Sequence, residues 1–422
     1  MNLLVVGGGG REHAIIRALK MNSCVETIYA LPGNAGISKL AECFPIPATD
    51  IDGIVDFASS HKIDFAVVAQ DDPLALGAVD RLHALGIPCF GPDAKAAEIE
   101  ASKIFSKKLM KKYGIPTAAF ETFSSAEDAV SYLKTASYPI VIKADGLALG
   151  KGVVIAESYE DAEKEVREMM EGGKFGKSGK SVVIEEFLTG PEVSVLSFTD
   201  GHTVCPMVSS MDHKRANDFD EGLNTGGMGV IAPNPLYTPE IAERCMREIF
   251  LPTINAMRSE GRPFKGCLYF GLMLTKNGPK VIEYNCRFGD PEAQAVLPLL
   301  KTDLLTVMQH VENETLSEIN VEFEDKSTCC VMIASGGYPL SYKKGLPISF
   351  GKANEMAYVY HSGTKLDDTG AFLTNGGRVL GVVAKADTLS EAIEKSYAAA
   401  KEITFEGKHM RSDIGQRALK GE

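Results

Sequence analysis

The segment VIEYNCRFGDPE at 281–292 holds the densest group of chemically capable side chains in the chain. It begins as a strand, so Glu283 and Asn285, two positions apart, point to one face. Carboxylate and amide oxygens are ligands that Mg²⁺ prefers, and Arg287 follows with a planar guanidinium suited to a carboxylate or phosphate. The spacing predicts a metal site beside an anion site. A buried strand end with a salt-bridged loop is the alternative.

Two lysines flank a glycine-rich loop. Lys143 ends an apolar strand, where an unpaired ammonium is costly, and Lys151 lies between Gly150 and Gly152. Such a pair can neutralise the phosphate oxygens of a nucleoside triphosphate. The loop is not a Walker A motif, because G-x-x-x-x-G-K-[ST] is absent. A solvated hairpin is the alternative.

Two further segments suit parts of a nucleotide site. The strand end VIEEFL at 183–188 offers backbone and apolar cover for an adenine ring, and Glu192 could accept both ribose hydroxyls. The charge cluster DHKR at 212–215 precedes NTGGMG at 224–229, whose N–H-rich backbone could hold an oxyanion. A solvated charge run is the alternative there, and His213 is expected to be structural.

Four glycines and Arg11 separate the first strand from its helix, where backbone N–H groups can hold an anion. The match to a G-x-G-x-x-G dinucleotide turn is weak, because Arg11 and Glu12 replace the third glycine and no acid follows the second strand. A nicotinamide cofactor is therefore disfavoured, and a phosphate or phosphosugar is expected. Asn34 and Asp71 follow neighbouring strands, where ligands of such sheets bind, or else form plain turns.

The elements that position these residues change along the chain. Strands at 3–6, 27–30, 65–69 and 87–90 alternate with helices at 11–20, 51–60 and 74–85, which predicts a doubly wound parallel sheet. A helix is expected at 94–113. Strands at 140–143, 153–156, 182–187 and 192–199 follow, with helices at 159–171 and 241–259, a strand pair at 267–275 and 280–284, and a final unit with strands at 329–334 and 379–384 and a helix at 390–403.

Bulk composition limits the class of protein. A chain of 422 residues is expected to hold about three domains, and its net charge of −12 argues against a nucleic-acid partner. The nine cysteines have no C-x-x-C spacing, as in a reduced cytosolic enzyme. No leader-like segment or long apolar run is present, so we expect a cytoplasmic protein without a membrane partner.

Taken in order, the motifs resemble those of the ATP-grasp superfamily and, within it, the family of glycinamide ribonucleotide synthetases. The landmarks include GGREHA at 9–14, PGNAG at 32–36, VIKADGLALGKGV at 141–153, DHKR at 212–215, NTGGMG at 224–229, IEYNCRFGDPE at 282–292, ASGGYP at 334–339, TNGGRVL at 374–380 and SDIGQRAL at 412–419. The resemblance implies ATP-dependent ligation of glycine to 5-phosphoribosylamine through glycyl phosphate, an early step of purine synthesis. A different acid or amine, or a silent nucleotide-binding module, is the rival interpretation.

The resemblance also implies roles for individual residues. ATP would be held by Lys103, Lys143, Lys151, Gly152, Glu185, Glu186, Phe187, Leu188 and Glu192, and Mg²⁺ or Mn²⁺ by Glu283 and Asn285. The catalytic pair would be Lys151 and Arg287. The two other substrates would be held by Gly10, Arg11, Asn34, Asp71, Asp212, Lys214, Arg287, Asp290 and Arg378, with Arg287 on the glycine carboxylate and Asp290 near its amino group.

The implied architecture is a pre-ATP-grasp domain at 1–102, an ATP-grasp core at 103–120 and 190–325, a mobile lid at 121–189 and a small mixed α/β domain at 326–422. A monomer or weak homodimer is expected. The chain departs from the family pattern at Asp71, where a glutamate is usual, and at 272–275, where the further acidic metal ligand of many ATP-grasp enzymes is missing. The polar segment 313–320 fits no pattern.

Overall fold

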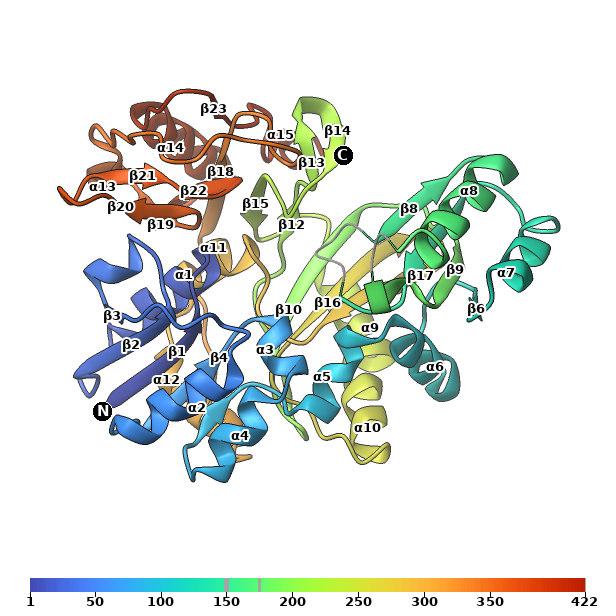
Figure 1. The fold of residues 1–422 in the computed structure, drawn as a ribbon, viewed down its shortest axis with the longest axis horizontal. Coiled ribbons are helices and arrows are strands. Elements are labelled where there is room, and N and C mark those ends of the chain that lie inside the picture. Colours follow the sequence, from blue (N-terminus) through green and yellow to red (C-terminus); the bar gives the residue numbers. More distant parts are fainter. Residues whose placement is uncertain (148–151, 174–175, 422) are drawn as a thin grey trace.

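The computed structural model describes residues 1–147, 152–173 and 176–421. Along the chain, a parallel α/β unit is followed by two antiparallel sheets and by a final mixed unit (Figure 1). The predicted α/β and α+β multidomain class is therefore confirmed. No helix within the described residues combines the length and the apolar character that crossing a bilayer requires.

The first sheet is parallel, with strand order β3-β2-β1-β4-β5. Its strands are β1 (Asn2–Gly7), β2 (Thr27–Pro32), β3 (Glu42–Cys43), β4 (Phe65–Val68) and β5 (Cys89–Phe90). The order reverses between β1 and β4, and ligands of such sheets bind outside the strand ends at that point. The glycines that follow β1 and the acid that follows β4 both lie there.

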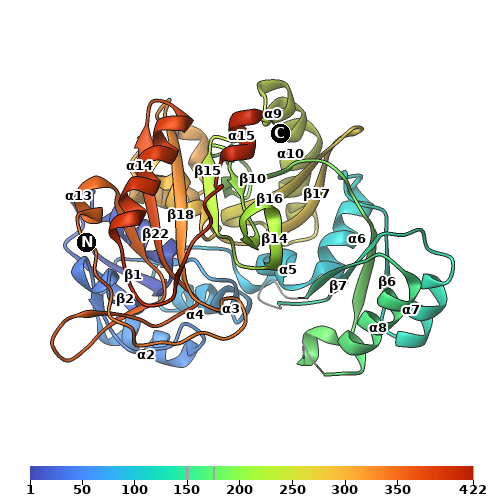
Figure 2. The same cartoon turned by 90° about the horizontal axis from the view of Figure 1, so that it is seen from above.

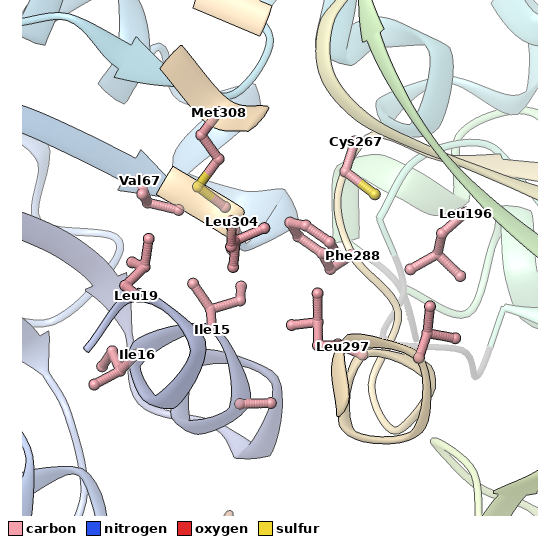
Figure 3. Packing of buried hydrophobic residues seen from close by; sticks show 14 of the residues in the cluster. Ile15, Ile16, Leu19, Val67, Leu196, Cys267, Phe288, Leu297, Leu304 and Met308 are labelled. Carbon is pink, nitrogen blue, oxygen red and sulfur yellow. The ribbon is translucent and has the colours of Figure 1, made fainter. Parts of the chain in front are cut away.

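Helices cover both faces of this sheet. They are α1 (Gly10–Leu19), α2 (Ile51–Ser60), α4 (Ala78–Ala84) and α12 (Leu304–Glu312). Alternate residues of β1 pack on opposite faces, so Leu3 joins the core with α1 and α12 while Leu4 joins the core with α2 and α4. Ile15 of α1 and Leu304 of α12 lie close together in that core (Figure 3). A helix from the central region thus completes the first unit.

Two antiparallel four-stranded sheets form the centre. One has the order β11-β10-β16-β17 and the other β6-β9-β7-β8. The second sheet, with its helices, projects away from the rest of the molecule in both views (Figures 1 and 2). The bounds are β6 (Phe120–Phe123), α7 (Ala126–Leu133), β7 (Ile140–Ala144), β8 (Val153–Ala156), α8 (Tyr159–Met170), β9 (Val182–Glu186), β10 (Glu192–Asp200), β11 (Val204–Pro206), β16 (Lys265–Thr275) and β17 (Gly278–Asn285).

The last sheet has the order β12-β15-β18-β22-β19, with β23 beside β18. Its elements are β12 (Met211–Asp212), β15 (Gly229–Ala232), β18 (Ser327–Ser335), β19 (Tyr358–His361), β22 (Arg378–Ala386), β23 (Lys408–His409) and the covering helix α14 (Leu389–Glu402). Because β15 pairs with β18, the predicted core segment 190–325 and the predicted last domain 326–422 share this sheet. The proposed domain boundaries stay a prediction.

Shorter elements connect these sheets. The helical ones are η1 (Ile37–Lys39), η2 (Gly176–Gly179), η3 (Asp218–Asp220), α11 (Glu292–Val296), η5 (Leu297–Leu299), η6 (Leu316–Glu318), α13 (Ala353–Met356) and α15 (Gln416–Lys420). Two small hairpins are formed by β13 (Arg215–Asn217) with β14 (Glu221–Asn224) and by β20 (Thr364–Leu366) with β21 (Phe372–Thr374). The sequence interpretation missed these hairpins because their strands are short and polar or exposed.

The prediction of a single helix at 94–113 is wrong. The structure has α5 (Ala94–Ala101) and α6 (Lys103–Tyr113), separated at Ser102, whose backbone is extended with φ −130°. The Ser102 hydroxyl accepts a backbone N–H of the next turn, as an N-cap does. The break places a lysine at the first position of α6.

The prediction of a single helix at 74–85 is also wrong. The structure has α3 (Asp71–Ala75) and then α4, because Gly77 between them takes a left-handed φ of +82°. Only glycine adopts that conformation without steric cost. The earlier start makes Asp71 the first residue of a helix and not part of a turn.

The long helix predicted at 241–259 is continuous but not uniform. It consists of α9 (Pro239–Cys245), a wider π turn at Met246–Phe250 and α10 (Leu251–Ser259). Pro252 at the start of α10 has no N–H and cannot make the regular backbone hydrogen bond. A π turn next to a proline is a common way to absorb that loss.

Candidate functional site

Strand β17 presents the predicted metal ligands. Glu283 lies opposite Gly271 of β16, and Asn285 lies opposite Tyr269. A Cβ atom at Gly271 would lie 3.0 Å from Cγ of Glu283, so the glycine leaves space for the acidic side chain. The structure therefore brings the two oxygen donors together on one strand end, as the spacing predicted.

Cations surround the Glu283 carboxylate. Burial acts to raise its pKa, but four cations outweigh burial and hold the pKa below its ordinary value. They are Lys214, Lys143, Lys103 and Arg287. Glu283 is consequently an anion in a strongly positive environment, which is the arrangement a polyphosphate and a divalent cation would occupy together.

The donor set suits Mg²⁺ or Mn²⁺ only if other ligands contribute. Glu283 interacts with its cations through charge alone, and neither its side chain nor that of Asn285 forms a hydrogen bond to another described residue, so both oxygens are available. Across residues 1–147, 152–173 and 176–421, no group of three His, Cys, Asp or Glu side chains could hold a metal. Mg²⁺ commonly takes one or two carboxylates plus phosphate oxygens and water. The residues fit an ion that a nucleotide helps to bind.

Lys143 belongs to a buried ionic group. Its Nζ lies 3.1 Å from Glu185 Oε1 and donates to the Ile282 carbonyl at 3.0 Å. The other oxygen of Glu185 lies 2.8 Å from Nζ of Lys107. Lys107 on α6 was not singled out from the sequence, because its surroundings read as an ordinary amphipathic helix. A charged residue on the buried face of α6 was the available signal.

Of the other two predicted ATP lysines, Lys103 lies within the described residues and Lys151 does not. Lys103 donates to the Gly146 carbonyl at 2.9 Å; burial lowers its pKa, against the attraction of Glu283. Lys151 lies outside the described residues, so its predicted catalytic role stays a prediction. Gly152, next to it, is buried and its carbonyl accepts the N–H of Ala144.

The predicted adenine segment changes from buried to exposed side chains after Glu185. Glu185 points inward, whereas Glu186 is exposed and pairs with Lys280 of β17 at 2.7 Å. Phe187 is 39% exposed and Leu188 is partly buried, so both leave apolar surface open to a ring. Since β9 is paired with β6 and β7 as far as Glu186, the Phe187 and Leu188 side chains are the parts of this segment that offer surface to a base.

Glu192 is already paired. Its carboxylate lies 2.7 Å from Nζ of Lys214. The charges of Glu192 and Glu283 raise the pKa of Lys214 well above its ordinary value, although burial acts against them. This lysine links the predicted ribose acid to the predicted metal acid, so both sequence predictions fall within one cluster.

Arg287 has a partner that the sequence did not reveal. It donates to Glu100 of α5 at 2.8 Å, and its Nε has no partner among the described residues. Asp71, at the start of α3, is close enough to act on the charges of both. Glu100 was missed because it lies in a plain helical stretch rather than in a motif.

Asp290 and Arg378 form a second ion pair, at 3.2 Å. Arg378 also donates to the carbonyls of Gly226 at 2.5 Å and Asp290 at 2.7 Å. Asp290 further accepts from Gln294 at 2.8 Å and from the Arg11 N–H at 3.3 Å. Arg11, Asp290 and Arg378, which were predicted to bind substrates, thus contact one another. Their contacts connect the first, central and last units of the chain.

Two further carboxyl groups, those of the partly buried Asp212 and the buried Glu292, lie near Gly227. A Cβ atom at Gly227 would lie 2.7 Å from Oδ1 of Asp212 and 2.6 Å from Cδ of Pro291, the residue before Glu292. Oδ1 of Asp212 is buried without a partner among the described residues. Burial and the charge of Glu292 raise the pKa of Asp212 well above its ordinary value, and burial raises that of Glu292.

The predicted residues of the first unit are largely engaged in the fold. Arg11 donates to Glu12 at 2.6 Å and to the Phe288 carbonyl at 3.0 Å. Asn34 donates to the carbonyls of Gly8 and His361 and accepts two N–H groups of its own turn. Their hydrogen bonds shape the loops, and their predicted contacts with a substrate remain predictions.

The space beside Gly10 contains polar atoms that lack partners. A Cβ atom at Gly10 would lie 2.5 Å from both Nε2 of Gln294 and Oγ of Ser362. Oε1 of Gln294 and Oγ of Ser362 are buried without a partner among the described residues. Neither residue was predicted from the sequence, because Gln294 lies between two alanines and Ser362 lies between His361 and Gly363, without a recognisable motif at either place.

Comparison with protein families gives matches over most of the chain. Models described as phosphoribosylglycinamide synthetase match the N domain at residues 1–100, the ATP-grasp (A) domain at 101–293 and the C domain at 328–417. A curated relative, the phosphoribosylamine–glycine ligase of Caldanaerobacter subterraneus subsp. tengcongensis, is 48% identical over 414 residues, covering 98% of this chain and 99% of the relative.

Solved structures agree. The crystal structure of phosphoribosylamine–glycine ligase from Thermotoga maritima aligns with a TM-score of 0.88 and 33% identity, covering 98% of this chain and 100% of that one. The biotin carboxylase domain of the Hydrogenobacter thermophilus 2-oxoglutarate carboxylase, solved with MgADP, aligns with a TM-score of 0.74 at 17% identity, covering 97% of this chain and 91% of that one. That second likeness concerns the fold alone.

Proposed function

This chain belongs to the phosphoribosylglycinamide synthetase family of ATP-grasp enzymes, and from that premise we propose which of its residues carry the reaction. The activity is that of an ATP-dependent phosphoribosylamine–glycine ligase of purine biosynthesis. ATP, glycine and 5-phosphoribosylamine give ADP, phosphate and glycinamide ribonucleotide.

The observation that carries the assignment is the cluster at the end of β17. Glu283 is a partly buried anion among four cations, and the Nε atom of one of these, Arg287, has no partner among the described residues. A carboxylate does not react with an amine in water, because oxide is too poor a leaving group. Transfer of the γ-phosphoryl group to the glycine carboxylate removes this obstacle. The cluster offers charge stabilisation for that transfer and a fork for the acceptor.

On the nucleotide side, Lys103, Lys143 and Lys151 contact the triphosphate, and the backbone and apolar groups of 185–188 contact the adenine. Glu283 and Asn285 would hold Mg²⁺ or Mn²⁺, which neutralises charge on the phosphate oxygens when it is bound. The lysines hold the γ-phosphoryl group against the acceptor oxygen, and water is kept out by the surrounding loops.

On the glycine side, Arg287 binds the carboxylate and Glu100 keeps the guanidinium oriented. Asp212 and Glu292 face the ammonium group. Asp290 contributes less directly, because Arg378 and Gln294 already occupy its oxygens. Glycine binding therefore aligns its dipole between a cation and an acidic pair.

Phosphoribosylamine enters from the first unit, beside Gly10, Arg11, Asn34 and Asp71. The free oxygens of Gln294 and Ser362 lie there as hydrogen-bond partners for a sugar. Its amine nitrogen attacks the acyl carbon of glycyl phosphate, and phosphate leaves with the carboxylate oxygen that bound it. Arg287 and the N–H groups of 226–229 stabilise the tetrahedral oxyanion.

Glycyl phosphate hydrolyses if water reaches it, so the sheet at 121–189 acts as a lid over the nucleotide. We place the enzyme in the cytoplasm, which fits its free cysteines, and propose a monomer or weak homodimer. Neither assignment bears on the chemistry.

The test is a coupled assay of ADP formation with purified protein. ADP is expected only when ATP, glycine and phosphoribosylamine are all present, with glycinamide ribonucleotide as product. Turnover with β-alanine or alanine in place of glycine, at equal or higher kcat/KM, would instead identify a ligase for another acid. ATP binding without turnover would indicate a silent nucleotide-binding protein.

A further inference from the structure

We propose that Lys107 is a positioning residue for ATP: it shares the Glu185 carboxylate with Lys143, so that the buried group keeps a net positive charge for the triphosphate. The inference rests on the proposed function, in which Lys143 contacts ATP. Lys107 itself need not touch the nucleotide. Its role is to keep Glu185 from neutralising Lys143 alone.

The contacts around Lys107 are short and fully enclosed. Lys107, Lys143 and Glu185 are 2%, 4% and 3% exposed. Lys107 Nζ lies 2.8 Å from Glu185 and donates to the Thr117 hydroxyl at 2.7 Å. Thr117 in turn donates to the Val281 carbonyl at 2.8 Å. The lysine is thus fixed to the strand that carries the predicted metal ligands.

Lys143 also connects Glu185 to β17, at Ile282, the residue after Val281. It donates to the Ile282 carbonyl at 3.0 Å while it contacts Glu185 at 3.1 Å. Glu185 lies on β9 and Lys143 on β7, both in the projecting sheet. Lys143 therefore links the Glu185 carboxylate directly to the Ile282 carbonyl of β17, and Lys107 links it to the neighbouring Val281 carbonyl through Thr117.

The charges in this group do not cancel. Two ammonium groups face one carboxylate, and buried charges are costly unless they are paired. Glu186, the next acid on β9, is exposed and already paired with Lys280. Glu283 also attracts Lys143, but it shares its charge with three further cations, Lys214, Lys103 and Arg287. A phosphate chain bound beside Lys143 would balance the remaining surplus of positive charge.

Removing the charge of Lys107 has a defined consequence. Glu185 would then pair with Lys143 alone, the group would become neutral, and the ammonium of Lys143 would be drawn away from the phosphates. ATP binding should weaken more than the chemical step slows. A purely structural lysine would instead change stability without selective loss of nucleotide affinity.

The protonation state of Lys107 provides a second test of its role in ATP binding. Burial lowers its pKa to about 8, against the attraction of Glu185 and with repulsion from Lys143. The groups that face Lys107 are Glu185 and Glu186 of β9, Lys143 of β7, Thr117, and the ring of Phe120 of β6, over which Lys111 also lies. Above that pH the ammonium becomes a neutral amine, which mimics its replacement.

The experiment compares Lys107→Met with Lys108→Met, an exposed lysine on the same helix, by calorimetric binding of a non-hydrolysable ATP analogue with Mg²⁺. We expect Kd for the analogue to rise roughly 10-fold or more in Lys107→Met and to stay unchanged in Lys108→Met. The double variant Lys107→Met/Glu185→Gln restores the net charge and should recover part of the affinity. Wild-type Kd in a folded Lys107→Met protein would overturn the proposal.

If Lys107→Met does not fold, the pH dependence of analogue binding by the wild-type protein tests the proposal. Its Kd for the analogue should rise several-fold as the pH increases through about 8, a range in which phosphate groups are already ionised. A flat profile would overturn the proposal. Absence of ligation by the wild type would refute the proposed function, whereas tight analogue binding by Lys107→Met in an active enzyme would refute only this inference.

Discussion

Arg287 and Glu100 form an ion pair at 2.8 Å that fixes the end of β17 from two directions. The second oxygen of Glu100 accepts the backbone N–H of Cys286 at 2.7 Å. One carboxylate thereby orients both the guanidinium and the chain that carries it. Nε of Arg287 remains without a partner among the described residues, so this N–H could donate to a bound carboxylate.

Arg287→Lys should raise KM for glycine by roughly 10- to 100-fold, the effect of losing a charge-assisted hydrogen bond. Lysine keeps the charge but cannot contact Glu100 and a carboxylate with one planar group. Steady-state kinetics with glycine varied at saturating ATP measures the change, and KM for ATP serves as the control. An unchanged KM for glycine would remove Arg287 from that site.

Asp212→Asn should weaken glycine binding yet stabilise the free protein. Burial and Glu292 raise the pKa of Asp212 above its unfolded value, so the protonated form is favoured in the folded state. The stability linked to that proton is complete at low pH and is lost as the pH rises through the raised pKa.

Asparagine removes this loss, so the gain in melting temperature should be larger at about pH 8 than at about pH 5. Thermal unfolding of both proteins at the two pH values measures it. Over the same comparison, kcat/KM for glycine should fall roughly 10-fold or more. A variant that is less stable at high pH, with normal glycine kinetics, would contradict both expectations.

Glu283→Gln should increase the Mg²⁺ concentration needed for half-maximal activity by roughly 10-fold or more, because an amide oxygen carries no charge to attract the ion. The measurement is a Mg²⁺ titration of ADP formation at fixed total ATP. Glu243→Gln, at an exposed position of α9, is a matched control. Identical titration curves for wild type and Glu283→Gln would mean that the metal is held elsewhere.

Phe219→Gly should stabilise the protein by about 1 kcal/mol without changing activity. Phe219 has a left-handed φ of +59° and is 85% exposed, and a bulky residue in that conformation costs about 1–2 kcal/mol. Glycine relieves the strain, and little burial is lost. Chemical denaturation measures the change. A decrease in stability would show that the ring makes a contact that compensates for the strain.

The parallel sheet of the first unit and the common face of Glu283 and Asn285 on β17 were predictable because both follow from local sequence patterns. Alternation of apolar strands and helices predicts the parallel sheet, and the two-residue spacing of Glu283 and Asn285 predicts their common face. The breaks at Ser102 and Gly77 were not predicted, since each depends on one backbone conformation within an otherwise helical pattern.

The partners of the predicted residues could not be found in this way. Glu100, Lys107 and Gln294 lie on helices whose local pattern is ordinary, and they reach the site only through packing of distant segments. The same packing explains why Asp290 and Arg378, which the resemblance assigned to substrates, contact each other. Spacing identifies which residues can do chemistry, whereas tertiary structure decides what holds them.

The central claim is that a glycine carboxylate oxygen receives the γ-phosphoryl group of ATP. Glycine labelled with ¹⁸O in its carboxylate tests it directly, by mass spectrometry of the phosphate released during turnover with phosphoribosylamine. The account predicts one labelled oxygen in each phosphate and one retained in the product amide. Unlabelled phosphate, with product formed at the normal rate, would contradict it.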